Sequence, residues 1–268
     1  LIAFISGSTG APKGVTYTHS IPLAAARMAG EELGRRAGGV NLETFAAFVL
    51  IDLAQGMTTV VPDMNLSKPA TVDPSRLVEA IEAWSPSSAF ASPVVLGKLV
   101  EHARSKGLQL PSLTDVLSAT APVPVSLHTA LREVSPEATL HVNYGATEGL
   151  TVSRIASDEI VGETAALTSK GHGSCVGRPF DETTVRVMRI TEEPVGTWSD
   201  EWLVEPGEIG EIVLEGPVVS HEYKDMPEAN AKSNIRREDA ILHRSGDLGY
   251  LDDQGRLWFC GRKAHRIE

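Results

Sequence analysis

Cysteine is scarce in this sequence, which holds only Cys175 and Cys260, far apart in the chain. No C-x-x-C pair occurs, so the spacing offers neither a zinc site nor a disulfide framework. Such low cysteine usage is typical of a reducing compartment, and we expect a cytoplasmic location.

Long apolar runs are missing as well. No run reaches the roughly 18 residues that a membrane span needs, so we expect no integral membrane segment. The apolar residues 1–5 are too few, and lack the basic flank, for a signal peptide. The chain begins without Met and ends on "GRKAHRIE" without a stop signal, so we expect a fragment of a longer protein.

Positive charge is in deficit, because 24 Lys and Arg face 35 Asp and Glu, a net charge of −11. Broad contact with nucleic acid needs a cationic surface, so we expect no nucleic-acid partner. A small nucleotide remains compatible with this charge, since a nest of backbone N–H groups can bind phosphate. The patterns G-x-S-x-G and H-E-x-x-H are also absent.

Strand and helix patterns alternate over the first 170 residues. We expect strands at 1–5 (buried), 57–61, 89–91, 115–118 and 139–143. We expect helices from Ser20 to Gly34, from Asp73 to about Trp84, from Ser92 to Gly107, and over about 125–134. This alternation predicts an α/β fold with a mostly parallel sheet and flanking helices.

The pattern changes after about residue 170. Stretches such as "TTVRVMRI" and "GEIGEIVLEG" alternate apolar and polar residues, and Asp253-Gln254-Gly255 predicts a hairpin turn. A smaller antiparallel β subdomain should therefore follow the parallel sheet. We place the α/β subdomain at residues 1–170, the β subdomain at residues 171–260 and a terminal segment at residues 261–268.

The stretch "SGSTGAPKG", residues 6–14, follows the first predicted strand. It fails the Walker pattern G-x-x-x-x-G-K-[ST], because Pro12 stands at the second Gly position and Gly14 follows Lys13. Its small residues, hydroxyls and one Lys still suit anion binding. An ordinary Gly/Ser turn is the alternative.

Two further motifs could carry chemistry. "NYGATEG", residues 143–149, follows a predicted strand, so Tyr144 would lie at a carboxyl end where open α/β sheets bind ligands. The Glu148 carboxylate would suit Mg²⁺, and a turn with a solvated Glu is the alternative. "HRSGDLGYLDDQGRLWFCGR", residues 243–262, contains Asp247, for which an Asx-turn before a strand is the alternative to a functional role.

These three motifs, and their order along the chain, resemble those of the adenylate-forming superfamily. This superfamily includes acyl-CoA synthetases, luciferases and adenylation domains of peptide synthetases. The resemblance implies ATP and Mg²⁺ as cofactors. It implies Lys13, Thr147 and Glu148 as catalytic residues, with Glu148 as the metal ligand. It implies these nucleotide-binding residues: Ser6, Gly7, Ser8, Thr9, Gly10, Lys13, Gly14, Ala121, Asn143, Tyr144, Gly145, Thr147, Asp247 and Arg262.

Each motif would take one part of the nucleotide. By resemblance, the loop grips the β- and γ-phosphates, Tyr144 stacks on adenine, and Thr147 lies near the α-phosphate. Asp247 accepts hydrogen bonds from the ribose and Arg262 reaches the ribose or a phosphate. "SATAPV", which contains Ala121, would line the adenine pocket.

The last residues depart from the family pattern G-R-x-D-x-x-I-K. Ala264 replaces the hinge acid and Glu268 stands where Lys is common. The resemblance covers nearly the whole chain, which corresponds to roughly the second half of the family's large N-terminal domain. The family's small C-terminal domain, with its adenylation lysine, is not in the sequence.

Several stretches resemble the β-lactone synthetases of bacterial long-chain olefin biosynthesis, among them "HVNYGATEGL" and "GHGSCVGRPF". The resemblance implies activation of a long-chain β-hydroxy acid as acyl-AMP, followed by ring closure. A long-chain acyl-CoA synthetase and a non-catalytic nucleotide-binding module are the alternatives. The expected partners are a small acyl substrate and enzymes of the same pathway. Phe45, Phe48 and Phe90 are candidates for the acyl pocket, with plain core as the alternative.

Overall fold

The computed structural model describes residues 1–5 and 12–266. The chain divides into two compact units. The β unit comprises Leu1–Ala25, Tyr144–Arg154 and Ala166–Glu268, and the α/β unit comprises Ala26–Asn143 and Ile155–Ala165. These units group residues by compactness and do not test the predicted boundaries at 170 and 260, which stay predictions.

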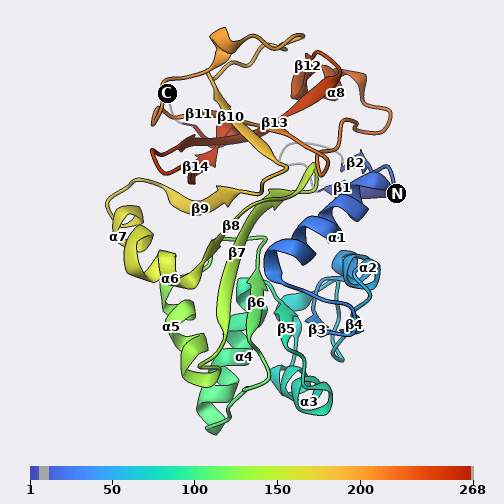
Figure 1. The fold of residues 1–268 in the computed structure, drawn as a ribbon, viewed down its shortest axis with the longest axis vertical. Helices are drawn as coiled ribbons and strands as arrows, with labels where there is room; N and C mark the ends of the chain where they lie inside the picture. The colour runs from blue at the N-terminus through green and yellow to red at the C-terminus, as the bar shows by residue number, and fades with distance from the viewer. Residues whose placement is uncertain (6–11, 267–268) are drawn as a thin grey trace. The chain divides into compact units, whose positions relative to one another are not determined.

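The α/β unit is built on parallel strands in the order β4-β3-β5-β6-β7 (Figure 1). The strands are β3 (Val40–Glu43), β4 (Thr58–Val60), β5 (Ser88–Phe90), β6 (Asp115–Ser118) and β7 (Thr139–Ala146). The main helices are α1 (Ser20–Leu33), α2 (Val49–Ala54), α3 (Pro74–Trp84), α4 (Pro93–Lys106) and α5 (Val125–Val134). Short helical segments are η1 (Ala46–Phe48), η2 (Pro69–Thr71), α6 (Ser157–Glu159), η3 (Ile160–Thr164) and α7 (Ala165–Thr168). The predicted parallel sheet with flanking helices is confirmed.

Apolar faces of α3, α4 and α5 pack with the strands in one core. In α3 this face is Leu77, Val78 and Ile81, which recur at helical spacing and are buried. The predicted helix ends are also found, because Gly107 takes a left-handed conformation (φ 63°) directly after α4. This packing fixes the parallel strands. The second predicted motif begins at the carboxyl end of one of them, β7.

The β unit contains an antiparallel sheet in the order β10-β11-β13-β14-β9-β8, with β12 paired to β13. Its strands are β8 (Gly149–Ala156), β9 (Ser174–Pro179), β10 (Thr184–Met188), β11 (Gly210–Glu215), β12 (Asn234–Arg237), β13 (Ala240–Leu251) and β14 (Leu257–Arg262). Its helical segments are α8 (Pro227–Ser233), η4 (Asp200–Trp202) and η5 (Lys263–His265). The predicted antiparallel structure is confirmed, and the predicted turn connects β13 to β14.

Two sequence-based expectations need correction. Residues 1–5 do not form a buried strand, because among the described residues β1 (Ile2–Ile5) pairs only with β2 (Lys13–Thr16) in a two-stranded antiparallel ribbon. Such a ribbon leaves one face uncovered, and the Phe4 side chain is 73% exposed. Strand β7 does not end at Asn143 but continues to Ala146, so Tyr144 lies within the strand. Across residues 1–5 and 12–266, every helix is too short or too polar to cross a bilayer.

Candidate functional site

The predicted phosphate loop lies mostly outside the described residues. Ser6, Gly7, Ser8, Thr9 and Gly10 belong to that part, and their roles stay predictions. Lys13 and Gly14 begin strand β2. A Cβ atom on Gly14 would lie 2.9 Å from Cγ2 of Ile2, so a larger residue here would displace the Ile2 side chain.

Asp247 lies at the centre of one predicted group of side chains. Strand pairing sets it opposite Arg262, whose Nη1 lies 2.9 Å from Asp247 Oδ1. The Tyr144 hydroxyl donates a hydrogen bond of 2.7 Å to Asp247 Oδ2. The fold therefore brings together three predicted nucleotide-binding residues from β7, β13 and β14.

Burial sets the protonation of this group. Desolvation raises the pKa of Asp247, while the Tyr144 hydroxyl and the Arg262 guanidinium oppose the rise. Burial also raises the pKa of Tyr144 well above its ordinary value, and the neighbouring Asp247 carboxylate adds to this rise. Tyr144 therefore stays protonated, and its hydroxyl remains a donor toward the carboxylate.

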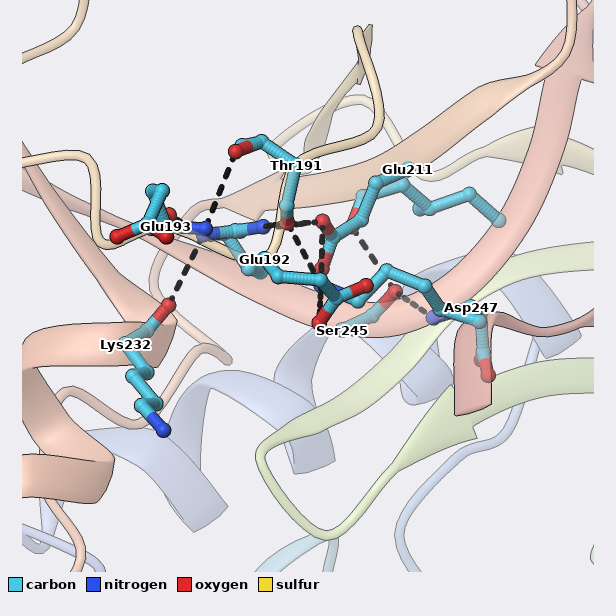
Figure 2. A network of polar contacts seen from close by, with 10 residues as sticks. Thr191, Glu192, Glu193, Glu211, Lys232, Ser245 and Asp247 are labelled. Carbon is cyan, nitrogen blue, oxygen red and sulfur yellow. Dashed lines mark hydrogen bonds and ion pairs between the residues drawn. The ribbon is translucent and has the colours of Figure 1, made fainter. Parts of the chain in front are cut away.

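A buried polar network supports the stretch that leads to Asp247 (Figure 2). The Glu211 carboxylate of β11 accepts from Arg244 Nη2 at 2.6 Å and from Lys263 Nζ at 3.1 Å. The Ser245 hydroxyl donates to the Ile212 carbonyl at 2.9 Å and accepts from the Asp247 N–H at 3.1 Å. The part of β13 directly before Asp247 is thus hydrogen-bonded to β11.

Arg244 also fastens neighbouring segments to this network. Its Nη1 donates to the carbonyls of Glu193 and Lys232, at 2.9 and 3.3 Å. Sequence reasoning missed Arg244, Glu211 and Lys263. The sequence could have pointed to Arg244 and Lys263, because Arg244 directly precedes Ser245 and Lys263 directly follows Arg262.

Thr147 and Glu148 lie in the turn between β7 and β8, and two tyrosines hold that turn. The Tyr17 hydroxyl donates to the Thr147 carbonyl, and the Tyr223 hydroxyl donates to Glu148 Oε1 at 2.6 Å. The Lys13 ammonium lies 4.8 Å from the centre of the Tyr223 ring. Lys13 and Glu148 therefore both contact the Tyr223 side chain. Tyr223 lies outside the motifs identified in the sequence.

A pocket of about 630 Å³ opens beside these groups in the β unit. Its lining includes the cations Lys13, Lys232, Arg244 and Lys263, and the carboxylates Glu211, Asp225 and Glu228. Glu211 is already ion-paired with Arg244 and Lys263. Ser245 and Gly246, which directly precede Asp247 in β13, also line the pocket.

Glu148 is the predicted metal ligand. In the described part of the chain, no group of three or more His, Cys, Asp or Glu side chains could hold a metal ion. Mg²⁺ fits this donor set because it is usually held by one or two carboxylates together with substrate phosphates and water. Glu148 supplies such a hard oxygen ligand.

The remaining predicted residues lie elsewhere along the chain. Ala121 is in the exposed loop between β6 and α5, directly after Thr120, which has a φ of 79°. Asn143 lies in β7, and its Oδ1 is buried without a hydrogen bond to any described residue. Gly145 is explained by packing, because a Cβ atom at this position would lie 2.9 Å from the Gly149 carbonyl oxygen.

The three candidate acyl-pocket phenylalanines do come together in the α/β unit. The ring centres of Phe48 and Phe90 are 4.6 Å apart, and those of Phe45 and Phe48 are 5.5 Å apart. Phe90 is buried, whereas Phe45 is 40% exposed. The cluster of three phenylalanines therefore reaches solvent at Phe45.

Comparison with known proteins gives concordant results. The chain is 42% identical to an olefin beta-lactone synthetase of Stenotrophomonas maltophilia, over 100% of this chain and 49% of the relative. It is 38% identical to an olefin beta-lactone synthetase of Xanthomonas campestris, over 100% of this chain and 48% of the relative. The chain thus spans about half the length of these curated relatives.

A solved structure shares the fold. O-succinylbenzoate coenzyme A synthetase from Bacillus subtilis, in complex with ATP and magnesium ion, matches with a TM-score of 0.77 at 23% identity. The match covers 99% of this chain and 50% of that one. Residues 1–224 match the family described as AMP-binding enzyme, and the chain belongs to that family.

Proposed function

We propose that the protein activates a long-chain β-hydroxy carboxylic acid with ATP and Mg²⁺, and then closes the acyl-AMP to a β-lactone. The observation that carries the adenylation step is the buried Asp247 carboxylate held between the Tyr144 hydroxyl and the Arg262 guanidinium. The whole-chain similarity to olefin beta-lactone synthetases supports the choice of substrate and product.

The Asp247 group would bind the nucleoside. Ribose hydroxyls would donate to the carboxylate, and a hydrogen bond to a buried charge is among the stronger ones in proteins. The Tyr144 ring would stack on adenine while its hydroxyl keeps Asp247 oriented. Asn143 is proposed to contact the nucleotide because its motif resembles that of the family.

Lys13, Thr147 and Glu148 would act on the phosphates. The Lys13 ammonium would neutralise charge on the outer phosphates, and Thr147 would lie beside the α-phosphate. Glu148 would hold Mg²⁺, which when bound supplies charge neutralisation between phosphate oxygens. Fixed charges of this kind lower the barrier because they need no reorganisation during the reaction.

The chemistry consists of two displacements. A carboxylate oxygen attacks the α-phosphorus, the bond to the β-phosphate oxygen breaks, and pyrophosphate leaves. The substrate's own β-hydroxyl oxygen then attacks the acyl carbon, the bond to AMP breaks, and the hydroxyl proton passes to solvent. The chain's share in both steps is to hold the reacting groups in contact.

A long-chain acyl-CoA synthetase would share the first step and then require coenzyme A. Ala264, which replaces the family's hinge acid, favours an enzyme without thiol transfer. We further propose that the protein works in the cytoplasm and associates with enzymes of its pathway.

Pyrophosphate–ATP exchange in the full-length protein tests the adenylation step. Glu148→Ala and Asp247→Ala should each lower exchange by at least roughly 100-fold, the scale of losing a fixed group that stabilises transition-state charge. Asp239→Ala, which removes an exposed carboxylate, serves as the control and should leave exchange unchanged. Wild-type exchange in both site variants would remove both roles.

A further inference from the structure

Tyr223 contacts two residues to which the proposed mechanism gives separate tasks. Its hydroxyl donates to Glu148 Oε1 at 2.6 Å, and its ring centre lies 4.8 Å from Lys13 Nζ. The first contact is a hydrogen bond to a carboxylate and the second is a cation–π contact. One side chain therefore connects the metal ligand to the phosphate-loop lysine.

The backbone of Tyr223 is itself held on both sides. The side-chain amide of Asn230, on α8, accepts from the Tyr223 N–H at 2.7 Å and donates to the Tyr223 carbonyl at 3.0 Å. Tyr223 also bridges to Val15 of β2, and its ring packs with Val15, Tyr17 and Ile21 in a small core. These contacts leave the ring little freedom, so its hydroxyl has a fixed position.

The same segment also bonds through its backbone to Glu148 and to Gly14, the neighbour of Lys13. The Ser220 N–H donates to the Glu148 carbonyl at 2.7 Å, and the Lys224 N–H donates to the Gly14 carbonyl at 2.7 Å. Residues 220–224 thus connect the end of the phosphate loop to the turn that carries Glu148.

We propose that Tyr223 is a positioning residue for adenylation, whose hydroxyl orients Glu148 toward the metal and whose ring holds Lys13 beside the pocket. This inference rests on the proposed function. The hydroxyl and the ring serve different targets, so substitutions can separate them. Tyr223→Phe removes only the hydrogen bond, whereas Tyr223→Leu removes the ring as well.

Metal dependence reports the role of the hydroxyl. In the full-length protein, Tyr223→Phe should raise the Mg²⁺ concentration for half-maximal pyrophosphate exchange by about tenfold, the scale of one hydrogen bond to a charge. The KM for the acyl substrate should not change. Tyr250→Phe is the matched control, because the Tyr250 hydroxyl donates to a backbone carbonyl, that of His172, at 3.1 Å.

The role of the Tyr223 ring is measured by combining substitutions at Tyr223 with a substitution of Lys13. Tyr223→Leu should lower exchange a further three- to thirtyfold below Tyr223→Phe at saturating Mg²⁺, the range of a cation–π contact. In a Lys13→Met background, the difference in rate between Tyr223→Phe and Tyr223→Leu should shrink by the part due to Lys13, because the ring then keeps only its packing in the core. A difference of undiminished size would disprove the role of the ring.

Direct metal binding separates this inference from the proposed function. Electron paramagnetic resonance of Mn²⁺ with ATP should show about tenfold weaker binding in Tyr223→Phe, with a thermal midpoint close to that of the wild type. Wild-type Mn²⁺ affinity and Mg²⁺ dependence in this variant would overturn the inference. An absence of exchange in the wild type would overturn the proposed function, and the Mn²⁺ measurement would still test Tyr223.

Discussion

At the scale of single residues, Asp247 combines burial with charge. Desolvation favours its protonated form, while Tyr144 and Arg262 favour the carboxylate. The net result is a pKa above the ordinary value. Because the folded pKa is raised, ionising this group lowers the stability of the fold as pH rises through that pKa. A buried carboxyl with a perturbed pKa beside specific charged and hydroxyl partners is typical of a functional site.

The raised pKa predicts how AMP affinity depends on pH. Protonation removes the charged acceptor for the ribose, so affinity should fall on acidification, starting above the pH range of an ordinary Asp. Isothermal titration calorimetry of AMP binding between pH 8 and pH 4.5 measures this. Asp247→Asn should bind about tenfold or more weakly at pH 8, with a flatter pH profile. An unchanged profile in Asp247→Asn would contradict the assignment.

At the scale of elements, glycines within and after α4 differ in conformation. Gly97 lies inside the helix, whereas Gly107 follows it with a φ of 63°. A Cβ atom at either position would have open space. Sterics are therefore equal at the two positions, and only the backbone conformation separates them.

Substituting alanine should act in opposite directions at these two positions. Gly97→Ala should stabilise the fold by roughly 0.5–1 kcal/mol, because alanine loses less backbone entropy in a helix. Gly107→Ala should destabilise it by about 1–2 kcal/mol, because a Cβ strains the left-handed conformation. Urea unfolding measures both, and a shift of the same sign in both variants would disprove this interpretation of the helix end.

The end of β3 carries a buried acidic group. Glu43 Oε1 accepts from the Phe45 N–H at 2.7 Å, and Asn41 Nδ2 lies 3.4 Å from Glu43 Oε2 and 2.8 Å from Asp52 Oδ2. Arg35 pairs with Asp52 at 3.3 Å. Burial raises the pKa of Glu43 to about 9, with a smaller contribution from the nearby Asp52.

Stability should therefore fall as pH rises from about 5 to about 9, because the folded protein keeps a proton on Glu43 that the unfolded chain has released. Glu43→Gln removes this titration. Its Tm should match that of the wild type at pH 5 and exceed it by a few degrees at pH 9. Equal slopes of Tm against pH in the two proteins would show that Glu43 does not carry the effect.

Elements with strong local signals were predictable from the sequence. Residues 115–118 and 125–134 form β6 and α5 as expected. Strand β3 was missed because its sequence, "VNLE", places Asn41 and Glu43 at buried positions. Residues 1–5 were wrongly expected to be buried, because an apolar run does not reveal that, in the described part of the chain, it pairs with β2 in a ribbon of two strands.

At the scale of the whole molecule, the β unit gathers residues from distant motifs. Lys13, Glu148 and Asp247 come from three separate stretches, and the sequence predicted each of them from its motif. Tyr223, which contacts Lys13 and Glu148, and Glu211, which pairs with Arg244 and Lys263, could not be predicted this way. Their roles depend on contacts between segments far apart in the chain, and neither stands in one of the motifs.

The central claim is that the acyl-AMP closes on its own β-hydroxyl. The most direct measurement gives the full-length protein a long-chain β-hydroxy acid, ATP and Mg²⁺ without coenzyme A, and identifies the products by mass spectrometry. We expect a β-lactone, with AMP and pyrophosphate released in equal amounts. AMP release that requires coenzyme A, with an acyl thioester and no lactone, would contradict the account.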